Sequence, residues 1–268
     1  MVALLDLHDR RLWRYKLADI RPNRVKNKLQ QGKCATVVGG VISAEVVDFL
    51  GQFGFDGAWL DTEHGPYGWE EVANMTRACD LWGMTPVARV HENEAGLITR
   101  TLDAGATGIA VPHITTKEEA IRAARAVKYP PEGNRGMSSG RQSYGVSGFH
   151  QKANQESVVI AFIEDVEAVE NLDDILTVDG IDVFLVGAGD LSASLGYTGQ
   201  QTHPEVVKTV DSCISRIVAA GRTAGAVVQQ GAIEKRIDQG VRYLLLTWHP
   251  WVSEGAKNYM ATIAAKES

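Results

Sequence analysis

The chain has 268 residues, of which 44% are hydrophobic and 22% are charged, and its 27 basic and 33 acidic side chains give a formal net charge of −6. This balance is typical of a folded globular protein and excludes extensive disorder. The lack of a basic excess argues against nucleic acid as a partner, and no segment approaches the roughly 18 consecutive apolar residues of a membrane span.

The cysteines and the N-terminal residues indicate the compartment. Cys34, Cys79 and Cys213 are widely separated and odd in number, which suits reduced thiols better than a disulfide framework or a zinc site. Residues 1–11 lack the basic segment, apolar stretch and cleavage site of a signal peptide. We therefore expect a cytoplasmic protein that binds no membrane.

The first 35 residues are polar and basic and precede the first apolar run. Residues 24–31 have the composition of a short helix. We expect residues 1–35 to form an N-terminal extension that covers the bottom of the fold or reaches a neighbouring chain. Residues 36–268 are expected to form a single domain.

From residue 36 onward, short apolar runs alternate with longer amphipathic segments. Most of the runs are continuously apolar, as expected for parallel strands that are buried on both faces. The expected strands are Thr36–Ile42, Gly57–Asp61, Pro86–Val90, Gly108–Pro112, Val158–Glu164, Val183–Val186, Ala224–Val228 and Tyr243–Thr247.

Helices are expected between these strands. Apolar residues recur at helical spacing over residues 44–53 and 206–217, and Ser43 and Thr116 are candidate N-caps because acidic residues follow them. Eight strands alternating with helices predict an α/β fold of the (β/α)₈ TIM-barrel type. The rival, a doubly wound open sheet, normally carries a GxGxxG turn after its first strand, and residues 38–41 read Val-Gly-Gly-Val instead.

A long connection rich in Gly, Ser and Pro runs from Tyr129 to about Gln155. A connection of this length is typical of a functional loop or a subunit contact. Its arginines, Arg135 and Arg141, are expected at the surface or in subunit contacts rather than in catalysis.

Ionisable side chains follow the expected strands at the point where each strand ends. Because the active sites of TIM barrels lie at the C-terminal ends of the strands, these groups are candidates for chemistry. They are Asp61, Glu63, His64, Arg89, His91, Glu92, His113, Glu164, Asp165 and Asp190.

Glu164 and Asp190 follow neighbouring strands, so their carboxylates can converge. Two carboxylates and water molecules form a site for a hard divalent cation such as Mg²⁺ or Mn²⁺. The alternative is that each carboxylate caps the helix that follows it. For the pair, we favour the metal site.

Arg89 and His64 have two interpretations each. Arg89 either forms a structural salt bridge with an acid of the barrel or binds a carboxylate or oxyanion of the substrate. His64 follows two acids within a tight turn, a concentration of titratable groups that favours acid–base chemistry. His91 and His113 are expected to be structural or rim residues, and His203 to lie at the entrance of a helix.

Four segments in this order resemble the HpcH/HpaI aldolase family, the class II pyruvate aldolases typified by 4-hydroxy-2-oxoheptanedioate aldolase. They are Leu-Asp-Thr-Glu-His-Gly-Pro at 60–66, Tyr-Pro-Pro-Glu-Gly-Asn-Arg-Gly at 129–136, Ile163-Glu164, and Gly-Ala-Gly-Asp-Leu-Ser at 187–192. The resemblance extends from about Val25 to the C-terminus. It implies a (β/α)₈ barrel with an exchanged C-terminal helix, usually assembled as a homo-hexamer, a trimer of dimers.

The resemblance also implies roles for individual residues. Glu164 and Asp190 match the two metal-binding carboxylates of the family, and Arg89 matches the arginine that holds the pyruvyl oxygen. Gly187 and Gly189 match backbone positions that lie against pyruvate.

Two further matches concern proton transfer. His64 with Asp61 matches the family's dyad, which acts through a water on the metal, and Asp103 matches a carboxylate that supports the histidine. The rim motifs contain no lysine, which disfavours a Schiff-base mechanism.

The chain departs from the family pattern at three positions. Phe162 replaces the usual glutamine two residues before the metal glutamate, Val38 replaces a common tryptophan at the end of the first strand, and Ala188 replaces a proline. Phe162 and Val38 are expected to line the substrate pocket, which puts the usual acceptor aldehyde in doubt.

The expected activity is that of a carbon–carbon lyase that depends on a divalent cation, Mg²⁺, Mn²⁺ or Co²⁺. It would reversibly cleave a 4-hydroxy-2-oxoacid to pyruvate and an aldehyde through a pyruvate enolate, so its partners would be small oxoacids and aldehydes. Two alternatives stay open. One is a CoA-thioester lyase of the citrate lyase β-subunit or malyl-CoA lyase type, and the other is a catalytically silent barrel that serves as a binding protein.

Overall fold

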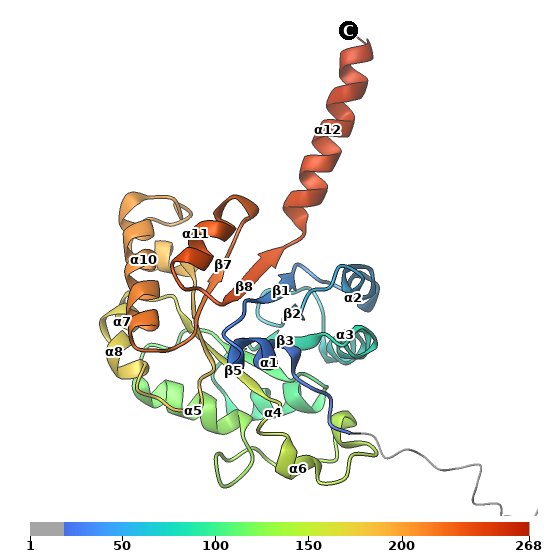
Figure 1. Ribbon diagram of the computed structural model, residues 1–268, viewed down its shortest axis with the longest axis vertical. Helices are drawn as coiled ribbons and strands as arrows, with labels where there is room; N and C mark the ends of the chain where they lie inside the picture. The colour runs from blue at the N-terminus through green and yellow to red at the C-terminus, as the bar shows by residue number, and fades with distance from the viewer. Residues whose placement is uncertain (1–18, 268) are drawn as a thin grey trace, which may run out of the picture.

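The computed structural model describes residues 19–267, in which eight parallel strands close into a barrel (Figure 1). Each strand pairs with its neighbours in the sequence, and β8 closes the barrel by pairing with β1. The strands are β1 (Ala35–Gly39), β2 (Gly57–Asp61), β3 (Thr85–Arg89), β4 (Gly108–Val111), β5 (Val158–Ile163), β6 (Val183–Val186), β7 (Ala224–Val227) and β8 (Tyr243–Thr247). The TIM-barrel prediction is confirmed.

The expected strands agree with the observed ones to within a few residues, and β1 shows the largest difference. It was expected to reach Ile42 but ends at Gly39. The next residue, Gly40, has a φ of 82°, a left-handed conformation that a strand cannot contain.

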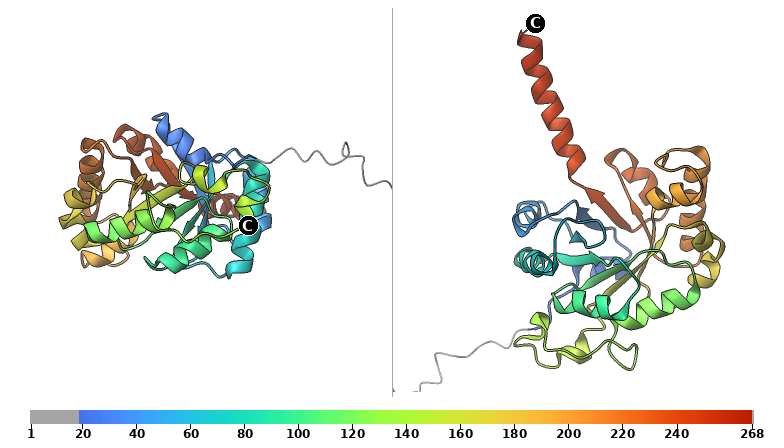
Figure 2. Two further views of the ribbon diagram at one scale, coloured as in Figure 1. Left: turned by 90° about the horizontal axis from the view of Figure 1, so that it is seen from below. Right: turned by 180° about the vertical axis from the view of Figure 1, so that it is seen from behind.

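Helices surround the barrel and form its outer layer (Figures 1 and 2). Ser43 and Thr116 cap α2 and α5 as expected, each accepting a hydrogen bond from a backbone N–H three residues later. The elements are α1 (Arg24–Gln30), α2 (Ala44–Gly51), α3 (Trp69–Trp82), α4 (Ala95–Asp103), α5 (Lys117–Val127), η1 (Arg141–Ser143), α6 (Phe149–Lys152), α7 (Val166–Glu170), α8 (Leu172–Ile175), α9 (Ala188–Ser194), α10 (Pro204–Ala219), η2 (Gln230–Ala232), α11 (Ile233–Asp238) and α12 (His249–Glu267).

The apolar core has two layers because successive side chains of a strand point to opposite faces. Inward side chains such as Val37 and Trp59 fill the inside of the barrel. Outward side chains such as Val38 and Leu60 pack between the barrel and its helices. This alternation decides which residue of each strand can reach a site inside the barrel.

Helix α1 covers the N-terminal end of the barrel. Its N-cap, Asn23, accepts a hydrogen bond from the backbone N–H of Lys26, and Val25 is fully buried against the inner apolar layer. Of the expected N-terminal extension, residues 1–18 lie outside the residues that the structure describes.

The long connection from residue 129 to 155 precedes β5 and therefore lies toward the same end. It contains η1 and α6, and it is fixed to the outer helices by ion pairs, among them that of Arg141 with Asp80. None of its residues lines the cavity at the opposite end of the barrel that contains Arg89 and Glu164.

Helix α12 extends away from the barrel, and all of its residues are exposed (Figures 1 and 2). Its exposed apolar side chains include Trp251, Tyr259, Met260 and Ile263. Within residues 19–267, no helix has both the length and the hydropathy needed to cross a membrane.

Candidate active site

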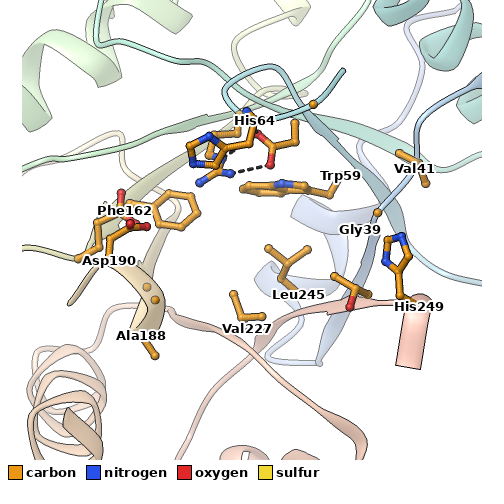
Figure 3. Close-up of a pocket in the computed structure, with 18 of the residues that line it drawn as sticks. Gly39, Val41, Trp59, His64, Phe162, Ala188, Asp190, Val227, Leu245 and His249 are labelled. Carbon is orange, nitrogen blue, oxygen red and sulfur yellow. Dashed lines mark hydrogen bonds and ion pairs between the residues drawn. The ribbon is translucent and has the colours of Figure 1, made fainter. Parts of the chain in front are cut away.

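A cavity of about 480 Å³ opens at the C-terminal ends of the strands. Most of the candidate residues named from the sequence lie in its wall (Figure 3). Those that line it are Asp61, His64, Arg89, Phe162, Glu164, Gly187, Gly189 and Asp190.

Arg89, the last residue of β3, is held by two acids of the turn after β2. Its Nε and Nη2 donate to the two carboxylate oxygens of Asp61 at 3.0 and 2.6 Å, and its Nη1 lies 2.8 Å from Glu63 Oε2. Burial alone would raise the pKa of Asp61, but the hydrogen bond and charge of Arg89 outweigh it and hold this pKa below its usual value. Arg89 is therefore a rigid, charged group in the cavity wall.

Two aromatic rings support the guanidinium of Arg89 from inside the barrel. The ring of Phe162 lies 5.6 Å and that of Trp59 lies 6.0 Å from its central carbon, and the two rings contact each other edge to face at 5.8 Å. These distances are within the range of cation–π attraction. Trp59 and Phe162 thus form an aromatic floor of the cavity next to the guanidinium of Arg89.

Glu164, which follows β5, has a buried carboxylate with one free oxygen. Its Oε1 accepts a hydrogen bond of 3.1 Å from the backbone N–H of His113, whereas Oε2 has no hydrogen-bond partner among the described residues. Burial raises the pKa of this group to about 7, and the backbone hydrogen bond and the charge of His113 oppose the rise. Such a carboxylate gains stability from a cation beside Oε2.

His113 adopts an unusual backbone conformation, with a φ of 51°, that aims its N–H at Glu164. Its ring Nδ1 lies 3.0 Å from Asp165 Oδ2. Burial disfavours the charged ring, but the hydrogen bond with Asp165 and the charge of Glu164 outweigh burial and raise the pKa of His113. The sequence indicated a structural or rim residue, and its contacts give it a positioning role.

The helix-capping alternative for the two carboxylates is wrong. Helix α9 begins at Ala188 with Gly187 as its N-cap, so Asp190 lies inside the first turn, and Asp165 rather than Glu164 precedes α7. Gly187 is required where it stands, because a Cβ on it would lie 2.6 Å from Glu164 Oε2. The free oxygen therefore lies against a glycine backbone.

Glu164 and Asp190 fit a divalent cation. Both line the cavity at the ends of the paired strands β5 and β6, and the charge of Asp190 contributes to raising the pKa of Glu164. Within residues 19–267, no group of three or more His, Cys, Asp and Glu side chains could hold a metal ion. Further ligands would come from substrate and water, as is common for Mg²⁺.

His64 lines the cavity with a side chain that is 68% exposed. Asp61 accepts a hydrogen bond from the backbone N–H of His64 at 3.2 Å, and the Nε2 atom of the ring lies 4.0 Å from Glu63 Oε2. In this structure Asp61 fixes the backbone of His64 and the side chain of Arg89, and the imidazole faces the open cavity.

The structure corrects the placement of two predicted residues. Val38 is fully buried and belongs to the layer between barrel and helices, so it does not line the cavity; its neighbour Gly39 does. Asp103, at the end of α4, is ion-paired with Arg135 at 3.1 Å and is not in the cavity wall. Within one copy of the chain, Asp103 therefore does not lie in the cavity that His64 lines.

Other lining residues were not identified from the sequence. Trp59 and Leu245 come from inward positions of β2 and β8, whereas Gln229 and His249 follow β7 and β8. The inward pair could have been found by counting two residues back from the polar end of each strand. No lysine is among the described residues of the cavity wall.

Known proteins resemble this chain in sequence and in fold. The family model HpcH/HpaI aldolase/citrate lyase matches residues 41–242. The hydroxypyruvate/pyruvate aldolase of Roseobacter denitrificans is 35% identical over 230 residues, which cover 83% of this chain and 89% of the relative. The 5-keto-4-deoxy-D-glucarate aldolase of Citrobacter koseri is 35% identical over 226 residues, which cover 81% and 86%.

Among solved structures, an HpcH/HpaI aldolase/citrate lyase family protein from Burkholderia cenocepacia superimposes with a TM-score of 0.85 at 27% identity. The match covers 90% of this chain and 99% of that one. Sequence, family model and fold lead to the same assignment. The chain belongs to the HpcH/HpaI aldolase/citrate lyase family.

Proposed function

We propose that this protein is an aldolase that reversibly cleaves a 4-hydroxy-2-oxoacid to pyruvate and an aldehyde with the help of a divalent cation. The observation that carries the proposal is the buried carboxylate of Glu164, whose Oε2 is without a hydrogen-bond partner among the described residues while Arg89 and Asp190 line the same cavity. The aldolase relatives at 35% identity support a carbon–carbon lyase.

The cation would be held by Glu164 and Asp190, where it would bind the pyruvyl group and stabilise negative charge on the keto oxygen. Arg89 supplies a second positive group. Two of its five N–H donors hydrogen-bond to Asp61, and Nη1 is ion-paired with Glu63 without a hydrogen bond to its Oε2, so N–H groups remain for a substrate oxygen. Its acid partners hold it in place before substrate arrives.

Cleavage requires a proton to leave the 4-hydroxyl group as the C3–C4 bond breaks. The electron pair of that bond passes to C3 and forms the enolate of pyruvate, the aldehyde departs, and C3 then takes up a proton. His64 faces the cavity, and a histidine can accept the hydroxyl proton directly or through water. The reverse order of steps forms the carbon–carbon bond.

The test is exchange of the C3 protons of pyruvate in D₂O, followed by NMR, because it needs no knowledge of the aldehyde. Protein freed of metal is incubated with pyruvate alone and then with Mg²⁺, Mn²⁺ or Co²⁺. We expect loss of the methyl proton signal only when metal is present. No exchange with any of the three metals contradicts the proposal.

Arg89→Ala provides the matched variant, and Arg100→Ala is its control. Arg100 is also an arginine near an aromatic ring, 4.7 Å from that of Trp69, but it lies exposed on α4. Arg89→Ala should reduce exchange at least about 100-fold, whereas Arg100→Ala should not reduce it. Activity that requires a CoA thioester would assign the chain to the CoA-lyase alternative.

Helix α12 supports a homo-oligomer in which copies of the chain exchange this helix. It leaves its own barrel with Trp251, Tyr259 and Met260 exposed, and Phe49 and Phe53 are exposed on the outside of the barrel. Burial of such side chains between subunits would be favourable. We expect the full chain to have the mass of a hexamer in solution, and removal of residues 250–268 to lower it; a monomeric full chain contradicts the exchange.

A further inference from the structure

The charged groups of the cavity are confined to one end. Figure 3 shows Asp190 and Phe162 on one side, His249, Gly39 and Val41 on the opposite side, and Trp59, Leu245 and Val227 between them. Arg89 is the one described lining residue with a fixed positive charge, and it pairs with Asp61 and Glu63 next to the aromatic floor. The proposed pyruvate-binding end is therefore the charged end.

The opposite end carries hydrogen-bonding side chains and no lysine or arginine of the described cavity wall. The side chains of Gln229 and Thr247 line it together with His249. The His249 ring stacks on Trp248 at 4.5 Å and lies over Gly40, where a Cβ would approach its Cε1 to 2.3 Å. The indole of Trp248 in turn donates to the carbonyl of Gly40. The imidazole is thus held in position by its neighbours.

A second cavity adjoins this end and adds no positive charge. It shares Val227, Gln229 and Thr247 with the first cavity, and Glu254 is its one ionisable side chain among the described residues. A carboxylate placed here would face a negative side chain and would have no lysine or arginine of this chain's cavity walls as a counter-ion.

The charge balance of the main cavity leads to the same conclusion. Its lining residues carry three carboxylates, those of Asp61, Glu164 and Asp190, and one guanidinium. Glu63, the second ion-pair partner of Arg89, raises the number of carboxylates to four, so one divalent cation would still leave an excess of one negative charge, and the carboxylate of the pyruvyl group would approach that cation. A second substrate carboxylate would be desolvated without a partner, which is unfavourable.

We propose that the aldehyde handled by this site is neutral and hydroxylated, so that the substrate is a monocarboxylic 3-deoxy-2-oxo sugar acid rather than a dicarboxylic one. This inference rests on the proposed aldolase function. In the synthetic direction, C3 of the pyruvate enolate bonds to the aldehyde carbon and the aldehyde oxygen takes a proton. Gln229, Thr247 and His249 hydrogen-bond the hydroxyl groups farther along the aldehyde chain.

The test compares two aldehydes of equal length, glyceraldehyde and tartronate semialdehyde, which differ in a terminal CH₂OH or carboxylate. Condensation with pyruvate is measured at saturating Mg²⁺. We expect kcat/KM to be at least about 30-fold higher for glyceraldehyde, in the range by which a site rejects a group it leaves unpaired. A ratio of ten or less overturns the inference.

A variant that introduces a positive charge tests whether the end of the cavity near Gln229 selects the aldehyde. Gln229→Arg adds a cation at the far end, and Gln155→Arg adds the same charge at an exposed position before β5, outside the cavity wall. Gln229→Arg should lower the glyceraldehyde-to-acid ratio at least fivefold, and Gln155→Arg should not change it. An unchanged ratio in a folded Gln229→Arg protein overturns the assignment; if that variant does not fold, Thr247→Lys replaces it.

The two proposals fail in different ways. Exchange of the pyruvate C3 protons is recorded on the same protein without any aldehyde. Absence of exchange contradicts the aldolase function itself. Normal exchange with equal use of both aldehydes contradicts only the preference for a neutral acceptor.

Discussion

Two buried carboxylates at opposite ends of the barrel differ in how many partners they have within the chain. At the N-terminal end, Asp56 Oδ2 accepts from Lys28 at 2.8 Å and from the backbone N–H and hydroxyl of Thr36 at 2.9 and 3.0 Å. Arg24 approaches its other oxygen at 2.8 Å. At the C-terminal end, Glu164 has one backbone hydrogen bond and a free Oε2.

This difference suggests that Asp56 stabilises the fold, whereas Glu164 serves the proposed activity. The contacts of Asp56 tie α1 to the barrel. Its Oδ1 has no hydrogen-bond partner among the described residues, like Glu164 Oε2, but it is ion-paired with Arg24, so the fold itself supplies a partner for each oxygen. Glu164 is equally inaccessible to water yet is left incompletely paired, an arrangement that costs free energy unless a ligand completes it. The two residues should therefore respond in opposite ways to the same kind of substitution.

Glu164→Gln should have the largest effect on activity. The substitution keeps the shape of the side chain but removes its charge, and we expect metal-dependent exchange of pyruvate C3 protons to fall at least about 1,000-fold. The melting temperature should stay the same or rise, because an unpaired buried charge is removed. Retained exchange, or a large loss of stability, would show that Glu164 is a structural residue like Asp56.

Arg89→Lys comes next. Lysine keeps the positive charge but cannot contact Asp61 through two parallel N–H groups while also facing substrate. We expect a fall of about 100-fold in exchange, measured at saturating metal. An activity within threefold of the wild type would mean that charge alone matters at this position.

Asp56→Asn tests the other end of the barrel. It removes the negative charge that pairs with Lys28 and Arg24 and replaces one acceptor oxygen by an NH₂ donor, so either Arg24 or the donors of Lys28 and Thr36 lose their acceptor. We expect a loss of about 2–3 kcal/mol in the free energy of unfolding in urea. Exchange per folded molecule should equal that of the wild type, and a specific loss of exchange would break the division between the two ends.

Gly40→Ala should have the smallest effect and should act on the aldehyde end alone. A methyl group would collide with the ring of His249, so kcat/KM for aldehyde should fall about threefold to tenfold as that ring moves. Gly54→Ala is the control, since Gly54 has a similar φ of 83° but no atom of the described chain within 4 Å of the added Cβ. Equal effects of the two variants would indicate backbone strain rather than displacement of His249.

Much of the barrel could be predicted because its strands are buried on both faces. Continuous apolar runs such as Val183–Val186 and Tyr243–Thr247 marked strands whose observed bounds are the same. The ionisable residues after the strands could be assigned to one rim for the same reason, since parallel strands all end on one side.

The errors arose where one residue of register or a distant partner decided the outcome. Val38 was placed in the pocket, but neighbouring residues of a strand face opposite sides, and Gly39 is the one that faces inward. The partner of Asp103 is Arg135, on a loop 32 residues away, a pairing that spacing alone cannot reveal. The free Oε2 of Glu164 likewise depends on three-dimensional packing.

The position of His249 has a consequence for how assembly and catalysis are coupled. This residue is both a wall of the cavity and the first residue of α12, so the orientation of its ring depends on how the helix is held. If copies of the chain hold each other's helices, subunit association and aldehyde affinity are thermodynamically linked. Dilution that separates subunits should then weaken binding of the aldehyde, and saturating aldehyde should strengthen the assembly by the same free energy.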